Sequence, residues 1–328
     1  MSYRQRSYLI FAAATAWLLL ATCGGCAGGP YLQAKFNRGN SAKGENNSKE
    51  VTVSRENQTY AKEIPEQGFL TLKSGNYRIV FEAASAWTLD ELHFEGRQFG
   101  LNNGHYGTVL TPKGGKWWGT GHSEGGREVV HSLKLTVDGE EHPVTTGETA
   151  EGKKVTLLKH STIWKFKAEV TVSLTPDYIF EMTRLEALDD CELDVLYYFM
   201  HCFPPTTTRW LAQTSEGDFE EGKLSAAGKM VLNRDTRWVA QYDSRSSLSL
   251  LCYTPAVIRG TKSCSMIWDL DRYHKYYLRQ NRGQSFKKGD KLDYTVVVKA
   301  LPEKPDGWNA TRAAAASLAE EISAAKND

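Results

Sequence analysis

The sequence lacks an excess of charge of either sign, since 40 lysine and arginine residues stand against 39 aspartate and glutamate residues. It also lacks a block of basic residues. Proteins with general affinity for nucleic acid need a positive surface that meets the phosphates, so this composition argues against nucleic acid as a partner. A neutral polysaccharide, or an acidic one met by local arginine and lysine side chains, is compatible with it.

Short motifs that carry familiar chemistry are absent as well. The chain has no Gly-x-x-x-x-Gly-Lys-Ser/Thr phosphate loop, no dinucleotide fingerprint opening a helix and no His-Glu-x-x-His motif. No Cys-x-x-Cys pair is matched by a second such pair, which argues against a structural zinc site. We therefore expect neither a cofactor nor a structural metal.

A long hydrophobic run is also missing. The apolar stretch Leu9–Ala21 is shorter than the ~20 residues that a membrane-spanning helix needs. Arg4 and Arg6 precede it, as in the basic start of an export signal. Residues 1–23 are therefore predicted to be such a signal, and the mature protein is expected outside the cytoplasm, where disulfides can form.

The predicted signal ends in Leu20-Ala21-Thr22-Cys23. This ending resembles the bacterial lipoprotein box, although Thr22 stands where that family prefers Gly, Ala or Ser. The resemblance implies that Cys23 is lipidated and anchors the protein to a membrane of the cell envelope, facing the periplasm or the exterior. The alternative is ordinary cleavage nearby, with Cys23 or Cys26 left free.

The remaining chain changes character twice. Residues 24–62 are Gly, Asn, Ser, Lys and Glu with few large apolar side chains, which is typical of a flexible tether. Residues 63–303 place apolar residues at every second position, the pattern of strands with one buried face. Residues 304–328 contain an alanine-rich stretch that is predicted to form a helix docked on the strands.

No helical pattern interrupts the strand region, so its sheets are expected to be mainly antiparallel. We predict an all-β fold, a large antiparallel β-sandwich with a short C-terminal α-helix. The alternation is clearest from Val129 to Val137, Trp164 to Leu174, Tyr178 to Met182, Leu193 to Phe203 and Leu292 to Ala300. Cys252 and Cys264 lie in two strand-like runs. Our hypothesis is that they face each other across adjacent strands.

The first cluster of candidate site residues lies in residues 101–138, where histidines and a tryptophan pair accompany many glycines. This mixture suits a sugar, which shows both hydroxyls and an apolar ring face. His122 and Glu124 would project from the same side of an extended loop, with the carboxylate orienting an acid–base imidazole. The alternative is a surface loop whose His and Glu only hydrogen-bond the turn. The predicted residues are catalytic His122 and substrate-binding Asn102, His105, Trp117, Trp118, Glu124 and Arg127.

The second cluster is centred on His201, which continues the apolar face of its strand. A lone histidine on such a face is often a satisfied core residue. His201, however, stands at the strand end before a Pro-Pro loop, where ligand sites are common, and we predict it to be catalytic. Trp210 follows the loop and is predicted to stack on a sugar ring.

The third cluster spans residues 272–279. In a strand, Tyr273, Lys275, Tyr277 and Arg279 share one face, and His274 and Tyr276 share the other. Cations and phenols together could neutralise a uronate carboxylate and move a proton. The alternative is a solvated strand face with cation–π contacts. The predicted residues are catalytic Tyr273 and Tyr276 and substrate-binding Arg272, His274 and Arg279.

Residues 65–303 resemble the galactose-mutarotase-like β-sandwich superfamily in strand number, length and histidine placement. The resemblance implies a large antiparallel sandwich that acts on or binds carbohydrate. In the aldose epimerases of that superfamily a mid-chain strand bears a histidine, and His201 in YYFMHCF falls in a similar place. Their earlier histidine would correspond to His105 or His122. Their late catalytic glutamate has no clear match here, which counts against epimerase activity.

We therefore expect an exported carbohydrate-active protein that acts on a polysaccharide or oligosaccharide. The leading hypothesis is a lyase, in which His122 or His201 is the base and Tyr273 or Tyr276 the acid. The alternatives are a non-catalytic glycan-binding lipoprotein and a purely structural envelope protein. None of them requires a metal, although His122, Glu124 and His201 could hold one if they converge.

Overall fold

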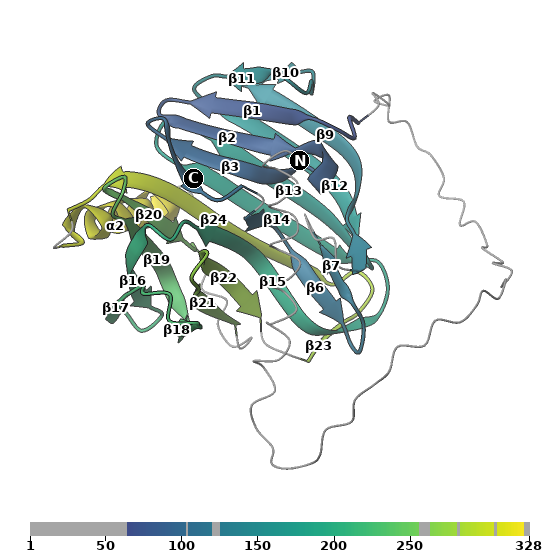
Figure 1. The fold of residues 1–328 in the computed structure, drawn as a ribbon. Coiled ribbons are helices and arrows are strands. Elements are labelled where there is room, and N and C mark those ends of the chain that lie inside the picture. Colours follow the sequence, from purple (N-terminus) through teal and green to yellow (C-terminus); the bar gives the residue numbers. More distant parts are fainter. Residues whose placement is uncertain are drawn as a thin grey trace, which may run out of the picture. The chain divides into compact units, whose positions relative to one another are not determined.

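The computed structural model describes residues 64–102, 104–119, 125–255, 263–304 without 281 and 282, and 307–324. These residues form three β-sheets in two layers and one C-terminal helix (Figure 1). The predicted all-β sandwich with a short C-terminal helix is confirmed. Almost all neighbouring strands are antiparallel, and the described exceptions are β1 with β11 and β7 with β8.

One layer is a ten-stranded sheet. Its strand β12 shows why the sequence forms it, because inward and outward positions alternate without a break along nine residues. The strands, in spatial order, are β10 (Glu140–His142), β9 (Val129–Val137), β12 (Val155–Ile163), β13 (Phe166–Leu174), β14 (Ile179–Ala187), β24 (Lys291–Pro302), β20 (Leu248–Tyr253), β19 (Thr236–Asp243), β16 (Thr207–Thr214) and β17 (Phe219–Lys223).

The other layer consists of two sheets. The five-stranded sheet contains β11 (Thr149–Glu151), β1 (Phe69–Ser74), β2 (Tyr77–Glu82), β3 (Thr88–Phe94) and β4 (Arg97–Gly100), with a short 3-10 helix, Ala83–Ser85, between β2 and β3. The nine-stranded sheet contains β18 (Lys229–Arg234), β21 (Ser263–Asp269), β22 (His274–Gln280), β15 (Cys191–Phe203), β6 (Val109–Pro112), β7 (Trp117–Gly119) and β8 (Gly125–Arg127), with β5 (His105–Tyr106) and β23 (Gln284–Phe286) also paired to β15.

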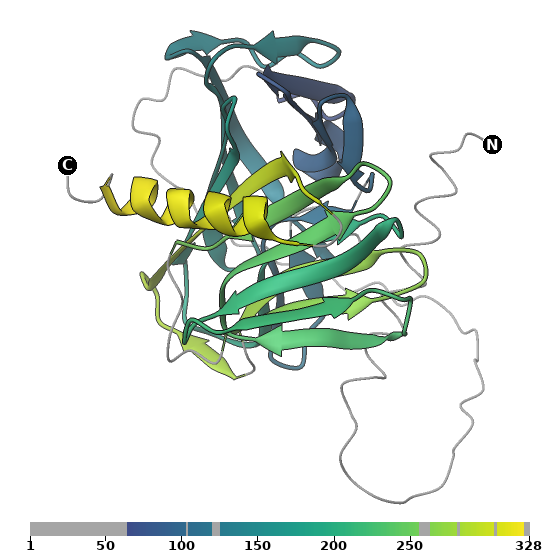
Figure 2. The same cartoon turned by 90° about the vertical axis from the view of Figure 1, so that its left-hand side faces the viewer.

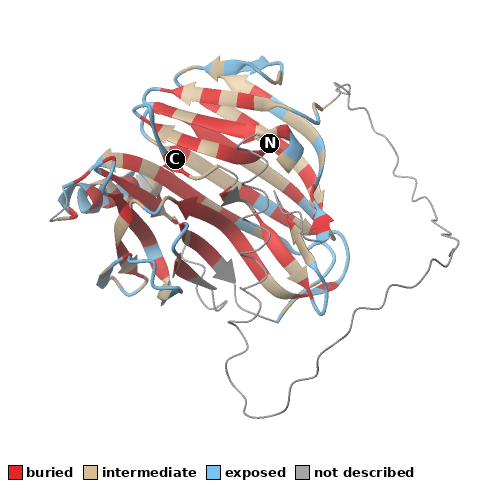
Figure 3. Ribbon diagram, in the orientation of Figure 1, coloured by how far each residue is buried: buried red, intermediate tan, exposed pale blue. Residues whose placement is uncertain are grey.

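A single hydrophobic core joins the two layers. Its buried side chains come from all three sheets, for example Ile79 of the five-stranded, Phe166 of the ten-stranded and Phe199 of the nine-stranded sheet. Figure 3 shows the buried residues following the strands and the exposed ones gathering at the turns. Burial of this continuous apolar surface is the main force that holds the sheets together.

Helix α2 (Asn309–Ala324) covers part of the outer face of the ten-stranded sheet (Figure 2). Trp308, Ala315 and Leu318 pack on a second cluster of sheet residues that includes Leu211 and Trp238. The predicted docking of the C-terminal helix is therefore observed. No helix among the described residues is both long and apolar enough to cross a membrane.

Two details differ from the expectations. The strands β20 and β21, which carry Cys252 and Cys264, belong to different sheets, so these cysteines are not cross-strand neighbours. The positions from Leu193 to Phe203 do not form one face, because the register of β15 shifts near Val195 and again between Tyr197 and Phe199. Each β-bulge adds a residue, and the alternation beyond it changes face.

Candidate functional site

His201 lies on the inner face of β15, inside the sandwich. It is 1% exposed, and its ring packs near those of Phe199 and Phe203. Its Nε2 lies 3.5 Å from Oε1 of Glu181, which comes from β14 in the opposite layer. The structure thus places this predicted catalytic histidine between the layers.

Tyr276 lies directly opposite His201 on the neighbouring strand β22 and shares its inner face. It is fully buried, its hydroxyl lies 3.4 Å from Oγ of Ser265, and burial raises its pKa above the ordinary tyrosine value. Trp210 is also a core residue, with its indole close against the backbone of Gly222. In this structure these side chains contribute packing.

His274 is the first residue of β22 and is buried next to a carboxylate. Its Nδ1 lies 2.9 Å from Asp269, a fully buried carboxylate that also accepts hydrogen bonds from the backbone N–H groups of Ser225, Ala226 and Ala227. Burial is the largest influence on His274 and lowers its pKa, in spite of the nearby carboxylate. The pair fixes the loop before β18.

The opposite face of the nine-stranded sheet is rich in aromatic and sulfur-containing side chains. Trp117 stacks on Tyr197 with ring centroids 5.6 Å apart and planes inclined by 6°, and Tyr277 meets the edge of Tyr197 at 5.2 Å. We call this surface the outer aromatic face. It comprises Val109, Trp117, Val195, Tyr197, Met200, Met230, Met266, Trp268 and Tyr277.

The floor of the outer aromatic face is buried, but Trp117 and Trp268 are partly exposed. The predicted stacking residue Trp117 therefore lies on this face. Trp118, its neighbour in sequence, instead packs against the core and the backbone of Gly126.

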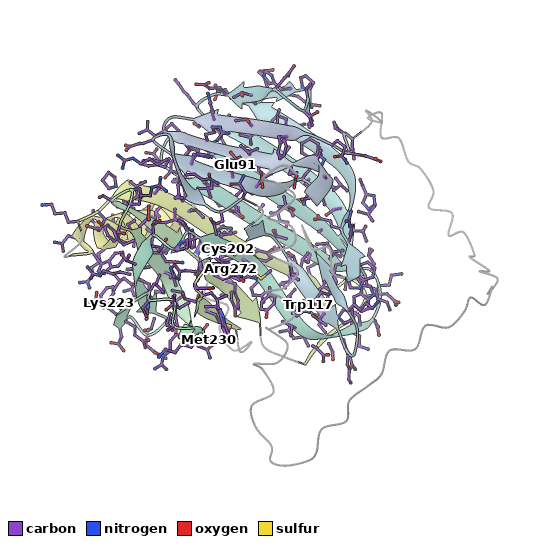
Figure 4. All side chains as sticks on the ribbon, in the orientation of Figure 1. Glu91, Trp117, Cys202, Lys223, Met230 and Arg272 are labelled. Carbon is purple, nitrogen blue, oxygen red and sulfur yellow. The ribbon has the colours of Figure 1, made fainter. Side chains whose placement is uncertain are left out.

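Beyond Met200 and Tyr277, the same side of the nine-stranded sheet carries polar side chains. Lys275 lies opposite Cys202 in the register of β15 and β22, and burial raises the pKa of the Cys202 thiol to about 11. Tyr273 is buried beside them, and burial raises its pKa above the ordinary tyrosine value. Arg272, labelled in Figure 4, is exposed.

A second polar group was missed by sequence reasoning. Glu91 accepts hydrogen bonds from both Nη atoms of Arg78 at 3.1 and 3.0 Å, from Nε2 of His93 at 3.0 Å and from Nδ2 of Asn102 at 3.1 Å. Gln98 donates to the Asn102 side-chain oxygen at 2.6 Å. We call these five residues the Glu91 cluster. Glu91 and His93, two apart on β3, were the available signal.

The surroundings of Glu91 and His93 lower the pKa of both side chains. Burial by itself raises the pKa of Glu91, but the hydrogen bonds from His93 and Arg78 outweigh it and leave that pKa below its ordinary value. Burial lowers the pKa of His93 more than the Glu91 hydrogen bond raises it. At neutral pH the carboxylate is therefore ionised and the imidazole neutral.

The Leu101–Gly104 segment connects the Glu91 cluster to β15. The backbone N–H of Leu101 donates to Cys202 O at 3.1 Å, and the Cys202 N–H donates to Gly104 O at 2.8 Å. A Cβ at Gly104 would lie 2.9 Å from the Cys202 Cβ, so glycine permits this approach. Asn102, between the two anchored residues, reaches Glu91.

The other predicted residues are scattered. Arg127 is exposed on the edge strand β8. The backbone of His105 pairs with His201, and that of Arg279 pairs with Tyr197. His122 and Glu124 lie outside the described residues. Within the described part of the chain, no group of three or more His, Cys, Asp or Glu residues could hold a metal ion.

No protein-family model matches the sequence, and no curated protein matches it either. Among solved structures, the chain is similar to a galactose mutarotase-like protein from Lactobacillus casei, with 9% identity, a TM-score of 0.43, and coverage of 71% of this chain and 100% of that one. It is also similar to a galactose mutarotase related enzyme from Lactobacillus acidophilus, with 10% identity, a TM-score of 0.41, and coverage of 72% and 98%.

An α-galactosidase from Lactobacillus brevis is similar at 9% identity and a TM-score of 0.48. The match covers 71% of this chain and 39% of the α-galactosidase.

Proposed function

We propose that this protein binds a carbohydrate on the outer aromatic face of the nine-stranded sheet. The observation that carries the proposal is the near-parallel stack of Trp117 on Tyr197, with Tyr277 against its edge. Flat apolar rings fixed in this way suit the apolar face of a sugar ring, since binding sites combine an apolar lining with a few placed polar groups.

The polar groups beside the stack support the same ligand class. Arg272 is exposed and Lys275 is partly exposed, so two cations border this side of the sheet. They suit the hydroxyls of a neutral sugar or the carboxylate of a uronate. The ligand of the proposal is therefore an oligosaccharide or polysaccharide, with acidic ones included.

Lyase chemistry has weaker support than binding. Tyr273 is protonated at neutral pH, as an ordinary tyrosine is, and could serve as the proton donor, although burial raises its pKa further. His201 and Tyr276, however, lie on the inner face of the same sheet, so they do not meet Tyr273 around one bound sugar. The form of the proposal that we carry forward is a non-catalytic glycan-binding protein.

The test is a binding screen of neutral and uronic-acid oligosaccharides by calorimetry, with absorbance recorded to detect an unsaturated lyase product. Trp117→Ala is expected to weaken binding roughly tenfold, because the stacked ring is lost. The matched control is Phe219→Ala, an exposed aromatic on β17 of the other layer. Equal affinity of the wild type and Trp117→Ala would contradict the proposal, and new absorbance would favour the lyase.

We also propose that the protein is exported and anchored through Cys23. The sequence supports this through the basic start, the short apolar run and the Leu-Ala-Thr-Cys ending. A glycan-binding domain held on a tether at the cell envelope would meet polysaccharides outside the cytoplasm.

A further inference from the structure

The Glu91 cluster has the features of a prebuilt hydrogen-bonding site. We infer that it is a second carbohydrate subsite, so that the ligand of the outer aromatic face is an extended glycan rather than a single sugar. This inference rests on the proposed function. Its basis is the fixed geometry of the cluster, its partial exposure and its direct connection to β15.

Glu91 orients the other members of the cluster. Its two oxygens receive the donors of Arg78, His93 and Asn102, and Gln98 holds the Asn102 amide in the orientation that lets it donate. Such a reciprocal network costs little further ordering when a ligand binds. The side chains of Arg78, His93 and Glu91 are 37%, 16% and 17% exposed, so they are held in place yet reachable.

The network also determines what His93 offers to a ligand. The ionised Glu91 carboxylate only accepts hydrogen bonds, so His93 must donate through Nε2. Nδ1 of the neutral ring then keeps its lone pair and is an acceptor. Arg78 retains further N–H donors beyond those that face Glu91. An acceptor and a donor side by side match neighbouring hydroxyl groups of a sugar.

The position of the cluster links it to the outer aromatic face. Asn102 belongs to the segment whose backbone pairs with Cys202, and Cys202 is two residues beyond Met200 of the outer aromatic face on β15. β5 pairs with β15 and contacts β3 of the five-stranded sheet, so one strand lies between β15 and the cluster residues on β3. A glycan of several units can contact both places at once.

A chemically similar group elsewhere serves as the matched control. On the outer face of the ten-stranded sheet, Nε2 of His160 lies 3.3 Å from Glu169, and Arg184 binds the same carboxylate at 3.0 Å. This trio is more exposed, at 38%, 31% and 54% in the same order. It belongs to the other layer of the sandwich, so it is not expected to affect glycan binding.

The experiment measures the affinity of the full chain for a ladder from monosaccharide to hexasaccharide of the best glycan. In the wild type, affinity is expected to rise with length. His93→Ala is expected to reduce hexasaccharide affinity roughly tenfold and leave disaccharide affinity unchanged, because one or two hydrogen bonds are lost. His160→Ala is expected to match the wild type at every length, whereas Trp117→Ala weakens all lengths.

The outcomes separate the two proposals. Equal wild-type affinity for short and long chains, or equal behaviour of His93→Ala and His160→Ala, overturns the second subsite and leaves the first intact. Failure of every glycan to bind the wild type overturns both. If His93→Ala does not fold, His93→Gln is measured instead. A wild-type hexasaccharide affinity that falls as His93 gains a proton below neutral pH, with Glu91 and Arg78 the charges that face it, supports the subsite.

Discussion

At the scale of single residues, the most demanding feature is a buried ion pair inside the sandwich. Nζ of Lys159 lies 3.0 Å from Glu128 and donates to the carbonyl oxygen of Ala86 at 2.9 Å. Ser161 donates a further hydrogen bond to Glu128. Lys159 and Glu128 are 4% and 0% exposed, so each charge depends on the other.

Lys159→Met is therefore expected to lower the free energy of unfolding by about 3–5 kcal/mol, because it leaves a buried carboxylate unpaired. Urea denaturation of the full chain measures the change. Adding Glu128→Leu should recover much of the loss, since no charge then stays buried. The surface pair Lys165–Asp189 is the control, and Lys165→Met should leave the urea midpoint almost unchanged. A loss in Lys159→Met no larger than in Lys165→Met would contradict this account.

At the same scale, the structure places some of the predicted residues on the candidate ligand surfaces and others elsewhere. Asn102 and Trp117 lie where the candidate ligand surfaces are. His201 lies near the end of β15 and on its apolar face, as expected, but Val195 and Tyr197, which were expected on the same face, lie on the opposite one because the register of β15 shifts on either side of them. A bulge depends on the partner strands, so period-two reasoning on one strand could not reveal it.

Glu91 and His93 could not be ranked from the sequence for a similar reason. Their importance comes from Arg78 on the neighbouring strand and from Asn102 on a segment after β4. Pairs of this kind are set by strand order and register, and spacing along one strand carries no information about either.

At the scale of elements, helix α2 is attached by both apolar and polar contacts. Leu318 is 1% exposed in the cluster beneath the helix, and the indole N–H of Trp308 donates to Glu221 at 3.1 Å. Thr311 donates to Glu303 and Ser249, which ties the first turn to the sheet. The alanine-rich composition predicted the helix, and its few large side chains are the ones that anchor it.

Leu318→Asp is expected to detach the helix, because a charge would replace a buried apolar side chain. We expect a loss of at least about 2 kcal/mol in urea denaturation, as for truncation of a buried leucine, together with faster proteolysis near residue 309. Ala316→Asp on the exposed side of α2 is the matched control. Equal protease resistance in the two variants would show that the helix contributes little to the fold.

At the scale of the whole molecule, the fold class was predictable because period-two alternation persists over most of the strand region. The division of the strands among three sheets was not predictable. Strands that follow one another often lie in different layers, as β15 and β16 do, and the pattern of a single strand does not say which layer it joins.

The proposed location in the cell envelope belongs to this scale too. The wild type should sediment with membranes after expression in a bacterium and should carry a lipid label. Cys23→Ala should release the protein into the soluble exported fraction, while Cys26→Ala should behave like the wild type. Wild-type protein that is soluble without a lipid label would exclude the anchor, and the carbohydrate proposals would stand unaffected.

The place of β24 in the ten-stranded sheet has a consequence for how the chain matures. This last described strand lies between β14 and β20. The Tyr77 hydroxyl on β2 forms hydrogen bonds with the backbone N–H and C=O of Ala300 on β24, although the two residues are 223 positions apart in the sequence. A ribosome must therefore release nearly the whole polypeptide before the sheet can close. Until then the two halves of the sheet stay open, and contacts so distant in sequence form slowly.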